Sequence, residues 1–339
     1  MRLKYYFEYY KDKIQILRLI SLSFFSFLAV SAGIKFHLFI KSLETGQVLE
    51  RPPGADAFLP ISSLMNIRHL FEFKSVHSAH PAGFFILLAA LFSSWLFSKS
   101  FCSWVCPFGF FSEFLTNIRK ILINKDFKIP VFLDYPMRGI KYLILTFFIY
   151  VIFFAMDADS IKLFLDSDYN KISDIKMYLF FAQITPFALK IILVLIVLTF
   201  FFNFFWCRYL CPYGALTALS GFLSLFKIKR TASGCVNCGS CADACPHNIK
   251  TDKINTVFSD DCTFCLLCVS SSKCGVLNVS PIFSNKKISP YLVFFSVIFI
   301  FAFFKYFAVF QGLWQNNIKP QEYKVLYEKR NYLDHPRGY

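Results

Sequence analysis

The chain has 339 residues, of which 56% are hydrophobic, 20% are aromatic and only 17% are charged. Soluble domains contain about 25% charged residues, so this composition excludes a soluble globular protein, a disordered chain and a coiled coil. The net charge of +15 is typical of a membrane protein whose cytoplasmic loops are rich in Lys and Arg. We therefore expect a multi-pass protein in contact with membrane lipid, and no nucleic-acid partner.

Five apolar stretches are candidates for transmembrane helices, because a helix crosses the hydrocarbon core in about 20 residues. They are residues 14–40, 81–97, 139–156, 187–206 and 288–313. The predicted fold class is mainly α-helical, with about five membrane helices. The first four belong to a membrane domain over residues 1–206, and the fifth is followed by a tail over residues 314–339.

The distribution of charge along the chain predicts its orientation. Basic residues gather in segments 1–13, 98–138 and 207–287, whereas loops 41–80 and 157–186 balance them with acidic residues. Since basic loops stay in the cytoplasm, we expect the N-terminus on the cytoplasmic side of the bacterial inner membrane and the C-terminal tail outside. All 12 cysteines lie in segments 98–138 and 207–287, so they would face the reducing cytoplasm, where disulfides are rare.

Two cysteine motifs predict a ferredoxin-like α+β domain over residues 231–284. Residues 235–246 read Cys-Val-Asn-Cys-Gly-Ser-Cys-Ala-Asp-Ala-Cys-Pro, the ligand spacing of bacterial [4Fe-4S] ferredoxins. Residues 262–268 repeat the first three cysteines, but Cys274 follows after five residues and Gly275 stands where the first motif has proline. We expect two [4Fe-4S] clusters, and a three-iron cluster without Cys274 is the alternative for one of them.

The fourth cysteine of each such motif usually ligates the other cluster, so we expect two crossed ligand sets. The first cubane site comprises Cys235, Cys238, Cys241 and Cys274. The second cubane site comprises Cys262, Cys265, Cys268 and Cys245.

A second kind of motif occurs twice, before the ferredoxin domain. Residues 101–109 and 206–214 share the pattern aromatic-Cys-x-aromatic-aliphatic-Cys-Pro-aromatic-Gly, 105 positions apart, and each follows an apolar span. Cysteines four residues apart share one face of a helix, and the proline then interrupts that helix. Residues 102–107 hold the first motif, and residues 207–230 hold the second motif and a linker.

Brought together, the two motifs would present four thiols, which we call the four-thiol site. It comprises Cys102, Cys106, Cys207 and Cys211. The alternatives are a third iron–sulfur centre, a pair of redox dithiols, and cysteines that only fill small packing positions.

This order of motifs over residues 80–275 resembles the NapH-like membrane ferredoxins and the membrane part of NosR-like proteins. The resemblance implies electron transfer between the quinone pool, or a cytoplasmic donor, and a partner protein of a periplasmic reductase system. An accessory role in maturation or redox regulation of a periplasmic metalloenzyme is the alternative it implies. Whether the chain is a quinol dehydrogenase component or only an electron carrier stays open. The flavin domain of NosR-like proteins is absent from the sequence, so we do not expect FMN. Haem needs axial ligands on facing helices, and His37, near the end of the first span, has no clear partner inside the membrane, so we do not expect haem either.

Three histidines lie close together in the loop before the second span. They are His69, His77 and His80. Because histidine titrates near neutral pH, we treat His80, at the start of that span, as a candidate quinone contact. The sequence has no glycine-rich dinucleotide loop and no phosphate-binding P-loop, so hydride transfer from NADH on this chain is not expected.

Overall fold

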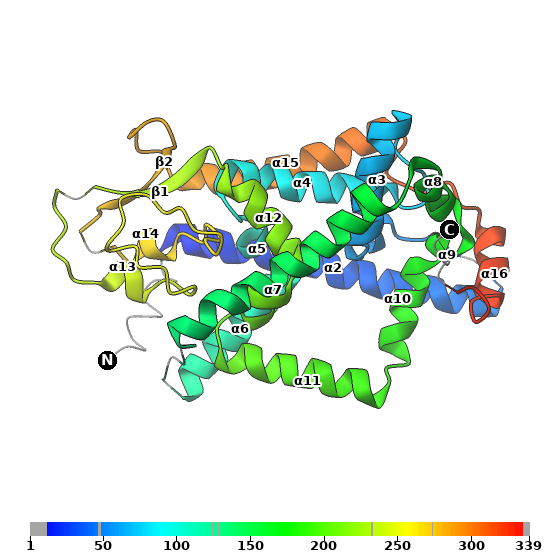
Figure 1. The fold of residues 1–339 in the computed structure, drawn as a ribbon, viewed down its shortest axis with the longest axis horizontal. Helices are drawn as coiled ribbons and strands as arrows, with labels where there is room; N and C mark the ends of the chain where they lie inside the picture. The colour runs from blue at the N-terminus through cyan, green and yellow to red at the C-terminus, as the bar shows by residue number, and fades with distance from the viewer. Residues whose placement is uncertain are drawn as a thin grey trace. The chain divides into compact units, whose positions relative to one another are not determined.

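The computed structural model of the chain describes residues 12–46, 49–123, 125, 127, 129–231, 233–272 and 274–334. Figure 1 shows a largely helical chain in which the described residues form one small sheet. In chain order, the elements are α2 (Lys13–Thr45), η1 (Pro53–Phe58), α3 (Pro60–Phe73), α4 (Pro81–Phe97), α5 (Phe101–Trp104), α6 (Pro107–Leu122), α7 (Val131–Tyr150), η2 (Val151–Ala155), α8 (Ala158–Asp166), α9 (Asp168–Lys171), α10 (Ser173–Ala182), α11 (Pro186–Phe201), η3 (Trp206–Leu210), α12 (Pro212–Phe222), β1 (Phe226–Arg230), α13 (Ser240–Asp243), α14 (Leu267–Ser270), β2 (Leu277–Pro281), α15 (Tyr291–Phe310) and α16 (Pro320–Glu328).

Three helical segments among the described residues are long and apolar enough to cross a membrane, namely α2, α7 continued by η2, and α15. Helices α10 and α11 form a fourth candidate only as a pair, because the chain bends by 83° between them. The bend precedes Pro186, which cannot continue the hydrogen bonding of a helix. Helix α4 is apolar but has only 17 residues, which is the lower end of the usual length of a membrane span. The expected mainly helical membrane fold is confirmed, whereas the count of five spans is not.

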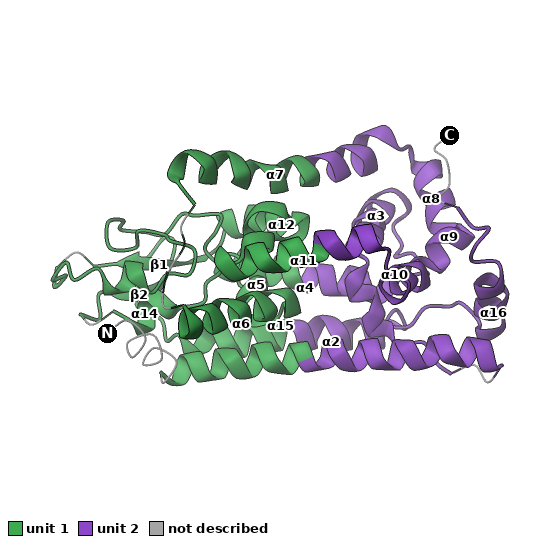
Figure 2. Ribbon diagram, turned by 90° about the horizontal axis from the view of Figure 1, so that it is seen from below, with its two compact units in different colours: residues 1–26, 90–145, 192–300 green, residues 27–89, 146–191, 301–339 purple. Residues whose placement is uncertain are grey.

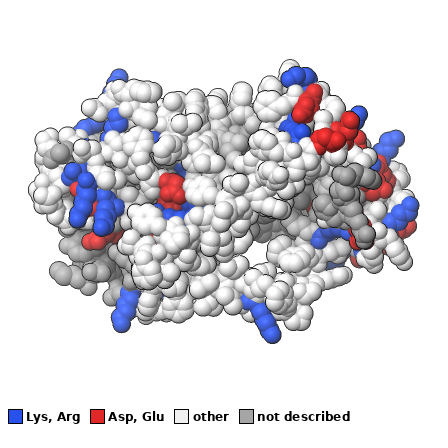
Figure 3. All heavy atoms as spheres, in the orientation of Figure 1, with Lys and Arg blue, Asp and Glu red and all other residues white. Residues whose placement is uncertain are grey.

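The surface of the span helices is strongly apolar. On α11, Phe187 and Val194 are more than half exposed, and on α15 so are Phe295 and Phe299. Figure 3 shows uncharged atoms over most of the visible face. Large apolar side chains exposed over whole helices are expected where lipid covers them, since soluble monomers rarely carry large apolar patches.

The chain divides into two compact units, which Figure 2 shows in green and purple. Unit one comprises residues 1–26, 90–145 and 192–300, and unit two comprises residues 27–89, 146–191 and 301–339. All 12 cysteines belong to unit one, whereas His69, His77 and His80 belong to unit two. The candidate iron–sulfur sites are therefore all built within one unit.

In unit one, a two-stranded antiparallel sheet brackets the cysteine motifs of the ferredoxin region. Strand β1 pairs with β2 in the register Phe226↔Pro281 and Ile228↔Val279. Ile228 and Val279 are buried, so one face of the sheet packs inward. The chain between the strands forms the short helices α13 and α14, and each of them begins two residues after the second cysteine of a motif.

Unit two is held by apolar clusters that involve helices far apart in sequence. Phe39 of α2 packs edge-on against Tyr323 of α16, with ring centroids 5.3 Å apart, and both side chains are buried. Leu64 and Met65 of α3 pack with Ile161 of α8 in a second cluster. The tail after the last span therefore contributes a helix to the core of this unit.

Candidate functional site

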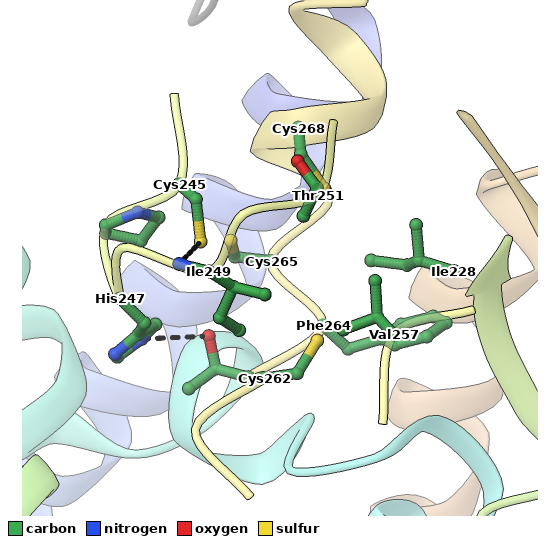
Figure 4. A pocket seen from close by; sticks show the side chains of 12 residues that line it. Ile228, Cys245, His247, Ile249, Thr251, Val257, Cys262, Phe264, Cys265 and Cys268 are labelled. Carbon is green, nitrogen blue, oxygen red and sulfur yellow. Dashed lines mark hydrogen bonds between the residues drawn. The ribbon is translucent and has the colours of Figure 1, made fainter. Parts of the chain in front are cut away.

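The second cubane site is a hollow lined by four cysteines. Figure 4 shows Cys245, Cys262, Cys265 and Cys268 around it, together with apolar side chains such as Ile228, Val257 and Phe264 and the polar side chains of His247 and Thr251. The fourth cysteine of the first motif thus meets the three of the second motif. This all-thiol set in an apolar cradle suits an iron–sulfur cluster, because soft thiolates are the ligands that such clusters use.

Burial controls the protonation of these thiols. It raises the pKa of both Cys245 and Cys262 to about 12. Since only thiolates bind iron, loading this site displaces protons from thiols that are otherwise protonated at neutral pH.

Both cysteine motifs bend through left-handed residues at the same two places. In the first motif these are Asn237 (φ +52°) and Gly239 (φ +71°), and in the second they are Phe264 (φ +53°) and Leu266 (φ +62°). Large side chains rarely adopt this conformation. Each second left-handed residue leads directly into a short helix, and such pairs turn successive backbone N–H groups towards one anion, as at many iron–sulfur sites.

The first cubane site lies nearer the surface. Cys238 is exposed, Cys235 and Cys274 are half-buried, and Cys241 is buried. The Cys238 thiol lies 3.3 Å from the Ser240 hydroxyl. Hydrogen bonds from Ser240, and to a smaller extent from the Cys274 side chain, lower the pKa of Cys238. Cys274 therefore lies beside a cysteine of the first motif in spite of its longer spacing.

The four-thiol site is built from two broken helices. Cys102 lies in α5 and Cys207 in the π-helical turn η3. Cys106 and Cys211 lie outside these turns, with extended ψ angles of 122° and 109°, and each caps the next helix. The spacing predicted each pair on one helical face, which is wrong because a residue before proline avoids the helical conformation.

The two halves of the four-thiol site exchange contacts. Cys102 Sγ lies 3.9 Å from Thr217 Oγ1 on α12, and Cys207 Sγ lies 3.8 Å from Ser112 Oγ on α6. Ser112 and Thr217 are also 105 positions apart. Cys102 and Cys207 therefore each contact the helix that follows the cysteine motif of the other repeat. Burial raises the pKa of Cys106 well above its usual value, and the nearby Cys102, Cys207 and Cys211 thiols raise it further.

The repeated glycine has a steric reason. A Cβ on Gly109 would lie 1.9 Å from the carbonyl oxygen of Cys102, and one on Gly214 would lie 3.3 Å from that of Cys207. The first distance is impossible for a real side chain, and the second is tight. Glycine thus lets each helix start pack against its own cysteine turn.

The four-thiol site adjoins the second cubane site. The backbone N–H of Lys99 donates to the Cys262 carbonyl at 3.3 Å. The Ser103 hydroxyl donates to the Thr263 carbonyl at 2.5 Å. These bonds dock the turn around Cys102 onto the loop of the second motif, a relation that the sequence did not predict.

A buried ion network lies next to this contact. Asp261, which precedes Cys262, is 1% exposed and lies 3.0 Å from Lys141 Nζ and 3.2 Å from Arg208 Nε. Arg208 lies between Cys207 and Cys211 in the sequence. Burial by itself raises the pKa of Asp261, but Lys141, Lys99 and other nearby cations lower it well below its usual value. In the sequence, this network is indicated only by two charged residues beside motif cysteines, Asp261 before Cys262 and Arg208 after Cys207.

His80 belongs to a buried polar cluster of unit two. Its Nε2 lies 2.7 Å from the Asn170 carbonyl oxygen, and its Nδ1 lies 3.0 Å from Asp56 Oδ1. Arg51 binds Asp56 and also Asp174, the latter through Nε at 2.5 Å. The sequence did not predict these four residues around His80, and the quinone contact of His80 stays a prediction.

The other two histidines of the predicted group have separate partners. His77 Nε2 lies 2.9 Å from Asp166 Oδ1, and His69 Nδ1 lies 2.8 Å from the Ser75 carbonyl oxygen. Among the described residues, no three His, Cys, Asp or Glu side chains are arranged to hold a single metal ion.

Two family matches cover three of the four cysteine motifs, and the motif at residues 262–274 lies outside both. A "4Fe-4S binding domain" family matches residues 79–130 and 184–231, which contain one Cys-x3-Cys-Pro motif each and begin 105 positions apart. A second family with the same description matches residues 229–251. No solved structure matches the chain significantly.

Several curated proteins are similar to this chain. "Putative electron transport protein YccM" of Escherichia coli K12 is 35% identical over 312 residues, which are 89% of this chain and 87% of the relative. "Ferredoxin-type protein NapH" of Haemophilus influenzae is 27% identical over 233 residues, 66% of this chain and 73% of its own. "Regulatory protein NosR" of Pseudomonas aeruginosa is 28% identical over 204 residues, 52% of this chain but only 25% of its own. The chain therefore belongs to the NapH/NosR/YccM-like family of 4Fe-4S ferredoxin-type membrane proteins.

Proposed function

We propose that the chain is a membrane-bound electron-transfer protein that connects the quinone pool, or a cytoplasmic donor, with a partner protein of a reductase system. The printed names of its relatives, an electron transport protein and a ferredoxin-type protein, support this function. When bound, [4Fe-4S] clusters would supply the one-electron carriers. The protein would bind these clusters, fix their positions relative to one another and shield them from water.

The observation that carries the proposal is the series of cysteine sets in unit one. The first cubane site includes the exposed Cys238, and the second includes the buried Cys262 and Cys268. The backbone of Cys262 is hydrogen-bonded to the N–H of Lys99, in the turn that leads to Cys102. Cys245 belongs by sequence to the first motif and by position to the second site, so the two sites share one short segment. The first cubane site, the second cubane site and the four-thiol site in this order suit electron transfer between a partner in the aqueous phase, which would dock at Cys238, and a group within the membrane.

We also propose that the four-thiol site holds a third iron–sulfur centre. Its donor set is all thiol, and the family match over both Cys-x3-Cys-Pro motifs is described as 4Fe-4S binding. The exchanged contacts of Cys102 and Cys207 hold the two motifs in a paired arrangement. The basic loops support an orientation with all three cysteine sets on the cytoplasmic side of the bacterial inner membrane.

The first test uses the full chain, purified anaerobically in detergent. A menaquinol analogue is added, and low-temperature EPR spectra and iron content are recorded. Reduced iron–sulfur signals identify quinol as a donor, whereas signals only after dithionite identify clusters of low potential that a cytoplasmic donor must feed. A chain without iron would contradict the proposal.

Two matched variants test the order of the sites. Cys102→Ser is expected to block electron flow from quinol and to leave both ferredoxin clusters in place. Cys238→Ser is expected to alter the first cluster and to leave the iron at the four-thiol site unchanged. Intact electron flow in Cys102→Ser would count against a relay through this site.

An accessory role in maturation or redox regulation of a periplasmic metalloenzyme is the second candidate, because one relative is named a regulatory protein. In that case, deletion would leave the partner enzyme present but inactive even when an artificial donor supplies electrons. Recovery of activity with the artificial donor would exclude this role.

A further inference from the structure

Lys99 is a buried cation at the junction of the four-thiol site and the second cubane site. It lies between α4 and α5, and 3% of its surface is exposed. Within the described parts of the chain, its ammonium group has neither an ion pair within 4.0 Å nor a hydrogen bond. A buried charge without a partner is strongly unfavourable, so an anion is expected beside it.

The surroundings of Lys99 indicate where that anion belongs. Its charge acts on the thiols of Cys102, Cys207 and Cys211 and on the carboxylate of Asp261. A Cβ on Gly214 would lie 3.4 Å from Lys99 Nζ, which puts the ammonium group at the start of α12, close to Cys211.

Asp261 does not neutralise Lys99 by itself. Its carboxylate lies 3.0 Å from Lys141 Nζ and 3.2 Å from both Arg208 Nε and Arg138 Nε, so three closer cations share its one negative charge. Further negative charge near Lys99 must come from the thiols. Four protonated thiols, or two disulfides, are neutral and would leave the cation unpaired, whereas thiolates around iron carry negative charge.

The cation is not repeated in the second half of the site. The position 105 residues after Lys99 is Phe204, so a single lysine interacts with cysteines of both repeats, namely Cys102, Cys207 and Cys211. The link between Lys99 and the second cubane site is made by the backbone, because the Lys99 N–H donates to the Cys262 carbonyl. A side-chain substitution thus removes the charge and leaves the link to the second cubane site intact.

We propose that Lys99 is the counter-charge of an anionic iron–sulfur centre held by Cys102, Cys106, Cys207 and Cys211, and that it sets the reduction potential of that centre. This inference rests on the proposed third centre. Reduction adds negative charge, which a nearby cation in a low-dielectric site stabilises. Lys99 is therefore a positioning and tuning residue that acts through its charge.

The test is a potentiometric titration of the purified full chain, followed by EPR. The signal of the four-thiol centre is identified as the one that Cys207→Ser removes. Lys99→Met is expected to shift its oxidised-to-reduced ratio at fixed potential at least about tenfold towards the oxidised form, which is about 59 mV for one electron. Lys99→Arg keeps the charge and is expected to keep the potential. Lys99→Gln provides a second neutral variant in case Lys99→Met does not fold.

Lys227 offers a matched control. It is 2% exposed, its Nζ donates to the Gly221 carbonyl at 2.9 Å, and its charge acts on Cys262. Lys227→Met is therefore expected to shift the potential of the second cubane cluster and not that of the four-thiol centre.

The two proposals fail in different ways. If Cys207→Ser removes no iron and no signal, the third centre itself is refuted, and the role of Lys99 falls with it. If the centre is present but both neutral Lys99 variants leave its potential unchanged, only the role of Lys99 is refuted. A shift of the second cluster as large as that of the four-thiol centre in Lys99→Met would also contradict the assignment.

Discussion

The indole Nε1 of Trp104 donates a hydrogen bond of 3.0 Å to the backbone carbonyl of Phe264, and neither residue is exposed to solvent. Trp104 lies within the first Cys-x3-Cys-Pro motif, and Phe264 is a left-handed residue of the second ferredoxin motif. One side chain thus joins the two kinds of cysteine motif and braces the loop that bends around the second cubane site.

Trp104→Phe removes this bond and keeps an aromatic ring. Because the buried Phe264 carbonyl loses this donor, we expect a loss of about 1–3 kcal/mol in the free energy of unfolding. Denaturant unfolding in detergent measures the loss. Trp95 is 37% exposed, so Trp95→Phe is the control and is expected to change stability by less than about 0.5 kcal/mol. Equal effects in the two variants would contradict the bracing role of Trp104.

Gly109→Ala places a methyl group against the carbonyl oxygen of Cys102, at 1.9 Å before any relaxation. Since the obstacle is backbone, we expect a cost of at least about 1–3 kcal/mol and loss of iron from the four-thiol site. A methyl group on Gly139 in α7 would enter open space, with nothing within 4 Å, and Gly139→Ala is expected to stabilise its helix by about 0.5–1 kcal/mol. Iron content and thermal unfolding distinguish the two variants. Full iron in Gly109→Ala would refute the steric argument.

Cys245→Ser and Cys274→Ser test the crossed grouping of the ferredoxin cysteines. Cys245 lies with Cys262, Cys265 and Cys268, so Cys245→Ser is expected to alter the same EPR signal as Cys265→Ser. Cys274→Ser is expected to alter the signal that Cys235→Ser affects. If Cys245→Ser and Cys235→Ser changed the same signal and spared the other, the motifs would bind clusters without crossing.

Asp56 makes the free energy of unfolding depend on pH in the acidic range. Burial by itself raises the pKa of Asp56, but Arg51 and His80 lower it below its ordinary value. The carboxylate therefore contributes its full stabilisation above the unfolded-state pKa of about 3.9, and this contribution is lost as the pH falls through the lower folded-state pKa.

Asp56→Asn is expected to cost about 3–5 kcal/mol at pH 7, because it removes one of the two carboxylates that pair with the buried Arg51, and to flatten the acid limb of the stability curve. Unfolding temperatures between pH 7 and pH 3 measure both effects. Asp166→Asn breaks the more exposed pair with His77 and is expected to cost less than about 1 kcal/mol. An unchanged acid limb in Asp56→Asn would show that other carboxylates control it.

The sequence predicts the parts of the fold that depend on spacing and composition. Apolar stretches reveal α2, α7 and α15, and the cysteine spacings reveal the motifs, because ligand geometry tolerates few alternatives. The bend before Pro186 was missed because proline can also begin a straight helix. The left-handed Phe264 and Leu266 could not be predicted, since large side chains avoid this conformation unless the surroundings impose it.

Ion pairs and hydrogen bonds between residues far apart in the chain could not be predicted from the sequence either. Asp261 stands beside a motif cysteine, but its partner Lys141 comes from an apolar helix 120 residues earlier in the chain. His80 was singled out by its residue type, yet its partners Arg51, Asp56 and Asn170 come from a loop and from the short helices η1 and α9, which the sequence pattern did not predict. Charged residues become interpretable only when the fold reveals which of them are buried together.

The exchanged contacts of Cys102 with Thr217 and of Cys207 with Ser112 also bear on how the protein is made. During synthesis from the N-terminus, Cys102 is made 115 residues before its partner Thr217. Neither repeat can close the four-thiol site alone, so metal delivered early would find half a site. If the four-thiol site holds iron as proposed, that iron is expected to enter only after both repeats have been inserted into the membrane, because a truncated chain offers two of the four thiols.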